Sequence, residues 1–190
     1  MDVVEQELIS KSKKGDLLAF EILINKYSKQ VFNILLRLLG NREDAEDVSQ
    51  EAFAKVYKKL HTYKGNSQFY TWLFRIAINA GKDHLKKKKW EYPLETLGED
   101  SFSFLQGHTV DPETTVINKE KKELIVRALM ELNLEQRAII ILRDIQDFSY
   151  EEISRILGIS IGTVKSRISR TRKILKEKLI NKPYGLGKDE

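Results

Sequence analysis

The sequence contains no cysteine, which excludes disulfide bonds and thiolate chemistry. It also lacks any uncharged run that approaches the roughly 20 residues needed to cross a membrane. The opening segment MDVVEQELISKSKKGD is acidic and polar, whereas a signal peptide starts with basic residues and continues with apolar ones. We therefore expect a cytoplasmic protein with no direct membrane insertion.

Features typical of an enzyme are scarce. The three histidines, His61, His84 and His108, are scattered and have the spacing of neither a metal site nor a catalytic triad. The chain has no glycine-rich loop suited to cradling a phosphate, and its carboxylates have no evident reason for the raised pKa that acid–base catalysis needs. The sequence therefore predicts a protein without enzymatic activity, metal or cofactor.

Residues 149–173, SYEEISRILGISIGTVKSRISRTRK, are the most informative stretch and predict a helix–turn–helix. Ser149 and Glu152 have the spacing of a capping box, and Gly158 can end the first helix in the left-handed conformation. Apolar residues of the second helix are expected to face the core, namely Ile161, Val164, Ile168 and Leu175. The residues that point outward or flank those that do are Lys165, Ser166, Arg167, Ser169, Arg170 and Lys173. This surface suits the major groove of DNA, although a helical hairpin with a solvated basic face has the same pattern.

The net charge of +5 is unevenly distributed. Residues 1–89 contain 17 Lys and Arg against 11 Asp and Glu, residues 90–159 contain 7 against 14, and residues 160–182 contain 8 against 1. Two basic blocks separated by an acidic one indicate two surfaces that bind a polyanion, and the acidic block between them is expected to have a different role.

Helical periodicity dominates the chain and no convincing strand pattern is present, so we expect an all-α fold. Before the helix–turn–helix, helices are predicted around residues 8–12, 20–38, 42–60, 68–89, 113–132 and 134–145. Two of the three prolines and six carboxylates, with no Lys or Arg, lie in residues 90–113, which is typical of an extended linker. The sequence therefore predicts two small helical domains, residues 1–89 and 114–182, joined by an acidic linker and followed by a disordered tail, residues 183–190.

Aromatic residues gather at the start of the helix predicted for residues 68–89, namely Phe69, Tyr70, Trp72 and Phe74. They precede Lys82 and the run 86–89 of four lysines. Rings that stack on bases beside cations that follow phosphates are a common means of holding unpaired nucleotides, although a buried aromatic cluster has the same sequence pattern. Asn79, Lys82 and Asp83 share one face of this helix because of their spacing.

Five carboxylates crowd the segment NREDAEDVSQEAF, residues 41–53, namely Glu43, Asp44, Glu46, Asp47 and Glu51. They spread around the predicted helix and no histidine lies nearby, which argues against a metal site. Both an exposed acidic face and a protein-docking face fit this pattern.

Three blocks together resemble the extracytoplasmic-function (group 4) subfamily of the bacterial sigma-70 family of RNA polymerase sigma factors. They are DAEDVSQEAFAKVY, FYTWLFRIAINAGKDHL and LNLEQRAIIILRDIQDFSYEEISRILGISIGTVKSRISRTRKIL, and they occur in the family's order with the family's gap. Asn133, His84 and Ser169 depart from residues common at those positions in relatives. Asn133 still caps a helix, whereas the other two changes bear on promoter preference.

The resemblance implies that residues 1–89 form sigma region 2 and residues 114–182 form sigma region 4. Region 2 would dock on the clamp helices of the polymerase's largest subunit through Asp44, Asp47, Gln50 and Glu51. It would open the −10 element and hold the non-template strand through Tyr63, Lys64, Asn66, Ser67, Tyr70, Asn79, Lys82 and Asp83. The outward residues of the helix–turn–helix would bind the −35 element, and the acidic linker would either pass through the enzyme's RNA path or serve only as a spacer.

The expected partners are core RNA polymerase, promoter DNA and an anti-sigma factor, possibly one anchored in the membrane. A sigma factor of this kind would direct the polymerase to promoters of a stress or envelope response. Three alternatives differ in what they require. A stand-alone regulator would bind duplex DNA without polymerase, a DNA-processing enzyme would need a divalent metal, and a helical scaffold would not explain the basic last helix.

Overall fold

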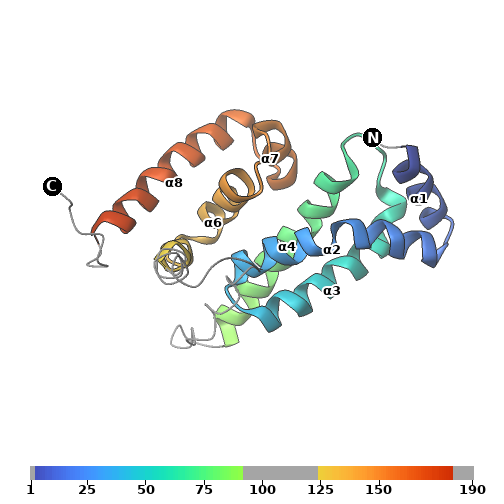
Figure 1. Cartoon of the computed structure of the whole chain (residues 1–190), viewed down its shortest axis with the longest axis horizontal. Coiled ribbons are helices and arrows are strands. Elements are labelled where there is room, and N and C mark those ends of the chain that lie inside the picture. Colours follow the sequence, from blue (N-terminus) through green and yellow to red (C-terminus); the bar gives the residue numbers. More distant parts are fainter. Residues whose placement is uncertain (1–2, 92–123, 182–190) are drawn as a thin grey trace, which may run out of the picture.

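The structure, a computed structural model, describes residues 3–91 and 124–181 (Figure 1). Its N-terminal half consists of α1 Val3–Lys13, α2 Leu17–Leu39, α3 Arg42–Lys59, the 3₁₀ turn η1 Leu60–Thr62 and α4 Phe69–Glu91. Helices α1, α3 and α4 pack around α2, which supplies much of the core. Leu23, Val31 and Leu35 of α2 have no exposed surface.

Local signals set the ends of α2. The Asp16 side chain accepts a hydrogen bond from the Ala19 amide at 3.0 Å and caps the helix N-terminus. Gly40 adopts φ = 76°, a left-handed conformation that only glycine takes readily, and its amide bonds to the Leu36 carbonyl. Asn41 then caps α3 by accepting from the Asp44 amide at 2.9 Å, so the chain reverses within two residues.

The C-terminal half contains a helical segment at 124–130, α6 Leu134–Ile140, the π-helical turn η3 Ile141–Ile145, α7 Tyr150–Leu157 and α8 Ile161–Asn181. The predicted capping box of Ser149 with Glu152 is formed, and Asn133 caps α6 as predicted, in a capping box with Gln136. Gly158 ends α7 at φ = 68°, as predicted. All the regular structure described for residues 3–91 and 124–181 is helical, which confirms the expected all-α class.

One predicted helix differs from the observed structure. Residues 134–145 form α6 followed by a single π turn, in which the Gln146 amide reaches back five residues to the Ile141 carbonyl at 3.0 Å. The Phe148 amide then bonds to the Leu142 carbonyl at 3.0 Å. This wider turn keeps Ile141 and Leu142 fully buried while placing Gln146 and Phe148 against the N-terminal half.

The two halves pack directly on each other. Helix α7 lies against α4, and α6 and η3 lie against α2, so that a single hydrophobic cluster continues from one half into the other (Figure 1). Beyond Glu91, the predicted linker lies outside the described residues, as does the predicted tail. Helix α4 runs two residues past the predicted domain boundary at 89.

Candidate nucleic-acid and protein interfaces

Helix α8 is held with one face buried and one face free. Val164, Ile168 and Thr171 are 0–2 % exposed and form its inward stripe. The predicted inward residue Ile161 is instead 39 % exposed, and Thr171 continues the stripe toward the C-terminus, because residues 164, 168 and 171 keep the three- and four-residue helical spacing. Among the predicted DNA contacts, Ser166 and Arg167 are half-buried, whereas the exposed ones are Lys165, Ser169, Arg170 and Lys173.

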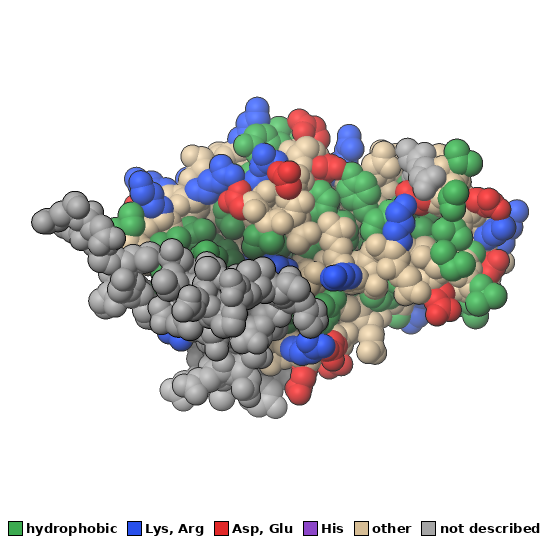
Figure 2. Space-filling view, viewed as in Figure 1, with side chains coloured by type: hydrophobic (Ala, Val, Ile, Leu, Met, Phe, Trp, Pro, Cys, Tyr) green, Lys and Arg blue, Asp and Glu red, His purple; other side chains and the backbone are tan. Residues whose placement is uncertain are grey.

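The cations of α8 fall into two groups. Arg167 donates to Glu135 of α6 at 2.6 Å, Arg172 binds Asp144, and Lys178 donates to Glu131 at 2.9 Å. Within residues 3–91 and 124–181, Lys165, Arg170 and Lys173 make no ion pair. Figure 2 shows Lys and Arg side chains gathered over the part of the surface formed by α8.

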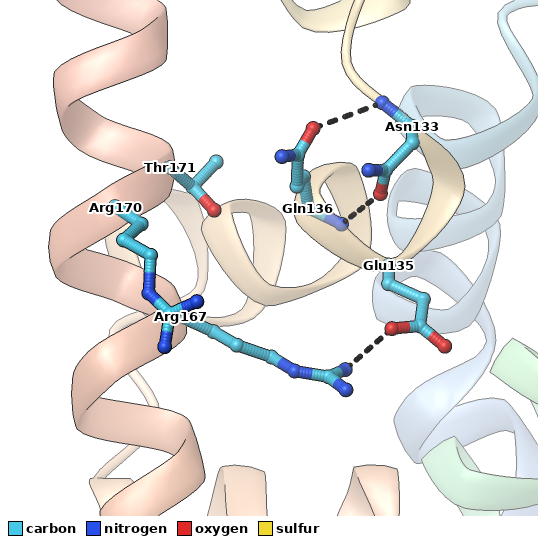
Figure 3. A pocket seen from close by; sticks show the side chains of 6 residues that line it. All are labelled: Asn133, Glu135, Gln136, Arg167, Arg170 and Thr171. Carbon is cyan, nitrogen blue, oxygen red and sulfur yellow. Dashed lines mark hydrogen bonds and ion pairs between the residues drawn. The ribbon is translucent and has the colours of Figure 1, made fainter.

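A shallow pocket of about 170 Å³ separates α8 from α6. It is lined by Asn133, Glu135, Gln136, Arg167, Arg170 and Thr171. Figure 3 shows Arg167 reaching across it to Glu135, while the reciprocal bonds between Asn133 and Gln136 close its far side. Arg170 extends from the same helix, and Figure 3 marks no bond between its guanidinium, which carries five donors, and the other five residues drawn.

The loop between η1 and α4 exposes polar side chains above an aromatic floor. Lys64 and Asn66 are exposed, and Ser67 is half-buried. Tyr63 is only 4 % exposed, because its ring packs on Phe69 and Trp72 and its hydroxyl donates to the Ser67 carbonyl at 2.5 Å. The structure therefore places Tyr63 beneath the loop, where it fixes the loop's shape and does not present its ring to a base.

Further along α4, the other predicted −10 residues lie on accessible surface. Asn79 and Asp83 are exposed, and Lys82 is half-buried, which lowers its pKa. Tyr70 is also half-buried, and its hydroxyl donates to Glu152 of α7. Burial, together with this hydrogen bond, raises the pKa of Tyr70 to about 12.

The four residues predicted to dock on polymerase have different surroundings. Asp44 faces α4, with its carboxylate 3.1 Å from His84 Nε2, and Glu51 forms an ion pair with Lys55 at 2.7 Å. The hydrogen bond from Lys55 lowers the pKa of Glu51. Asp47 and Gln50 are exposed on the outer side of α3.

A groove of about 320 Å³ runs between α2 and α3 beside these residues. Its lining is Ser28, Lys29, Phe32, Glu46, Ser49, Gln50 and Phe53. Sequence reasoning did not find this groove, because Phe32 and Phe53 lie 21 positions apart and only the antiparallel packing of α2 on α3 brings them together. Of the predicted docking residues, Gln50 alone lines it.

Within the part of the chain that the structure describes, no three His, Cys, Asp or Glu side chains are grouped so that they could hold a metal ion. None of the helices described there is long and apolar enough to span a bilayer.

Comparisons with known proteins agree with this arrangement. Residues 23–91 match the family described as Sigma-70 region 2, and residues 122–175 match Sigma-70, region 4. The chain is 36 % identical over 184 residues to the ECF RNA polymerase sigma factor SigW of Bacillus subtilis, covering 94 % of this chain and 98 % of that protein. It is 34 % identical over 182 residues to the ECF RNA polymerase sigma-E factor of Escherichia coli K12, covering 93 % and 95 %.

A solved structure shares the fold. The sigma factor RpoE of Bartonella quintana, in its co-crystal structure with the anti-sigma factor NepR, superposes with a TM-score of 0.63 at 26 % identity. That alignment covers 90 % of this chain and 99 % of the other. The two regions are matched in order and the curated relatives are aligned over nearly their full length. The chain therefore belongs to the extracytoplasmic-function subfamily of the sigma-70 family of RNA polymerase sigma factors.

Proposed function

We propose that the chain directs core RNA polymerase to promoters by three separate surfaces. The exposed face of α8 binds the −35 element, the loop at 63–67 and helix α4 hold the opened −10 element, and α3 with the adjoining groove docks on the polymerase. The observation that carries this proposal is the set of exposed cations Lys165, Arg170 and Lys173 on the outer face of a helix–turn–helix, none of which forms an ion pair with the residues that the structure describes. The chain itself performs no catalytic step in this scheme.

The α8 surface is suited to duplex DNA. Helix α8 is the second helix of the motif, and in helix–turn–helix proteins the second helix enters the major groove. Arg170 can donate two hydrogen bonds to a guanine edge, whereas Lys165 and Lys173 supply charge for phosphates. Arg167 is tied to Glu135, so a DNA phosphate would have to compete with that carboxylate for its guanidinium.

The α3 surface is suited to a helical protein partner. Phe32 and Phe53 provide an apolar floor, and Gln50 and Asp47 provide polar edges. Buried aromatic anchors surrounded by polar groups are the usual source of affinity in protein interfaces. We assign this groove and its rim to the clamp helices of the polymerase's largest subunit.

Two further assignments follow from this function. A protein that works on RNA polymerase acts beside the chromosome, so we propose that this chain acts in the cytoplasm. The anti-sigma factor in the Bartonella co-crystal structure supports an inhibitory protein partner for this chain as well.

Reconstituted run-off transcription with bacterial core enzyme on a promoter library tests the proposal. We expect transcripts that depend on the added chain, and a consensus with two elements. Asp47→Ala should reduce binding to core, and Arg170→Ala should reduce −35-dependent initiation, while both variants keep the wild-type circular dichroism spectrum. Arg172→Ala is the matched control, because Arg172 is an exposed α8 cation already bound to Asp144. Tight duplex binding without core, and no transcript with it, would favour the stand-alone regulator.

A further inference from the structure

Helix α1, to which the proposed function gives no role, lies beside η1 and the start of the loop at 63–67 (Figure 1). Lys13 in the last turn of α1 donates from Nζ to the Tyr63 carbonyl at 2.5 Å, although the two residues are 50 positions apart. The same ammonium lies 5.5 Å from the centroid of the Tyr63 ring. Lys13 thus contacts the first residue of the loop through both its main chain and its side chain.

The inward face of α1 determines where Lys13 lies. Three of its residues at helical spacing are only 3–6 % exposed, namely Glu5, Ile9 and Ser12. Glu5 accepts a hydrogen bond from the Tyr27 hydroxyl of α2, and its carboxylate lies 3.3 Å from Lys26 Nζ. A buried carboxylate is stable only with such partners, so this contact fixes the register of α1 on α2. The end of α1, and with it Lys13, is therefore held against the loop.

The hydrogen bond from Lys13 restrains one peptide plane of the loop. A trans peptide is planar, so a fixed direction of the Tyr63 carbonyl also fixes the Lys64 amide, which points the opposite way. The Tyr63 hydroxyl in turn donates to the Ser67 carbonyl at 2.5 Å. The loop is therefore held at both of its ends, and the exposed side chains of Lys64 and Asn66 lie between them.

We propose that Lys13 is a positioning residue for recognition of the −10 element, because it holds the loop at 63–67 in the one shape that accepts the preferred base. This inference rests on the proposed role of that loop. A loop that is already ordered loses less conformational entropy when the preferred base binds, and it cannot readjust to accommodate another base. Lys13 thereby contributes to base preference without touching the DNA.

Lys13→Met tests this inference, because methionine keeps an unbranched side chain and removes the charged donor. Lys14→Met is the matched control: Lys14 is exposed, and within residues 3–91 and 124–181 its side chain forms no hydrogen bond or ion pair. Lys13→Arg keeps a cationic donor and serves as the rescue variant. The double variant Lys64→Ala/Asn66→Ala identifies the base position that the loop reads.

Each variant is combined with bacterial core polymerase on a promoter selected with the wild-type chain and on its single-base variants. Competitive run-off transcription then gives the ratio of transcripts from the preferred base and the other bases, which does not depend on the amount of folded chain. We expect Lys13→Met to lower this ratio by about three- to ten-fold at the position that the loop reads, and to leave the −35 preference unchanged. Lys13→Arg should restore most of the ratio, and Lys14→Met should keep it.

Two results would overturn the inference while the proposed role of the loop stands. One is an unchanged ratio in Lys13→Met when the double variant loses it, or an equal loss in the two methionine variants. The other is uniform weakening of Lys13→Met on every promoter with a shallower dependence on salt, which would assign Lys13 to a phosphate. If the double variant changes no base preference, the proposed role of the loop fails and the inference fails with it.

Discussion

The Arg137 guanidinium joins two helix C-termini that belong to different halves of the molecule. It donates to the Leu38 carbonyl at 2.7 Å, near the end of α2, and to the Leu129 carbonyl at 3.0 Å, near the end of the 124–130 segment. It also donates to the carbonyls of Met130 and Leu132. Burial lowers its pKa to about 10, so it remains charged at neutral pH, where it complements the negative ends of both helix dipoles.

Arg137→Met should therefore leave several buried carbonyls without a donor. We expect a loss of about 2–4 kcal/mol in the free energy of unfolding, measured by urea denaturation. Arg172→Met is the control, since its ion pair with Asp144 is exposed and should contribute about 0–1 kcal/mol. Equal losses in the two variants would contradict the role assigned to Arg137.

Gly81 allows α4 to approach α2 closely. A Cβ at this position would lie 2.9 Å from Leu38 Cδ2 and 3.0 Å from Leu35 Cδ2, and both leucines are fully buried. Gly81→Ala should cost about 1–3 kcal/mol through overpacking, despite alanine's better helix propensity. At Gly162 of α8 the nearest heavy atom would be 3.9 Å away, so Gly162→Ala should leave the midpoint of thermal unfolding unchanged or raised. A stabilising Gly81→Ala variant would show that the helices can move apart.

Arg170 tests the α8 surface quantitatively. If it binds a guanine edge in two places, Arg170→Ala should weaken binding of holoenzyme to the −35 element by about 1–3 kcal/mol and relax the base preference at one position. Lys173→Ala should instead weaken all sequences alike and reduce the dependence of binding on salt. Competition assays with single-base variants of a selected promoter separate these outcomes. Uniform weakening by both variants would assign Arg170 to a phosphate.

Phe53 tests the groove between α2 and α3. Phe53→Ala should weaken binding to core polymerase by about 2 kcal/mol or more if the side chain anchors a partner helix. Tyr57→Ala is a useful control, because Tyr57 is an exposed aromatic of the same helix that does not line the groove. Affinities for core polymerase, measured on variants that retain wild-type thermal stability, test whether Phe53 is an anchor. Equal effects of the two substitutions would place the contact elsewhere on α3.

The raised pKa of Tyr70 predicts that the free energy of unfolding depends on pH in the alkaline range. Its pKa is raised above the usual value near 10 to about 12, which means that the folded state favours the neutral phenol. The corresponding stability is fully present below pH 10 and is lost as pH rises toward 12. Unfolding measured between these pH values should therefore show a smaller loss in Tyr70→Phe than in the wild type. Identical pH profiles would mean that the phenol is not held by Glu152 in solution.

Local features of this protein follow from the sequence because each depends on residues within one helical turn. The capping box at Ser149, the cap at Asn133 and the left-handed Gly158 are all formed as predicted. The spacing of Val164 and Ile168 also identified the buried side of α8, and hence its free basic side. The roles assigned to individual residues of that side remain predictions.

Sequence alone determined the all-α class, the positions of most helix ends and the family, because caps, periodicity and family motifs are written in short segments. Only the tertiary structure decided which aromatic side chains are accessible to a partner and which are packed against other parts of the chain. It buried Tyr63, opened a groove above Phe32 and Phe53, and set Tyr70 against Phe148. These contacts join residues up to 78 positions apart, and they depend on the packing of whole helices, which no local pattern specifies.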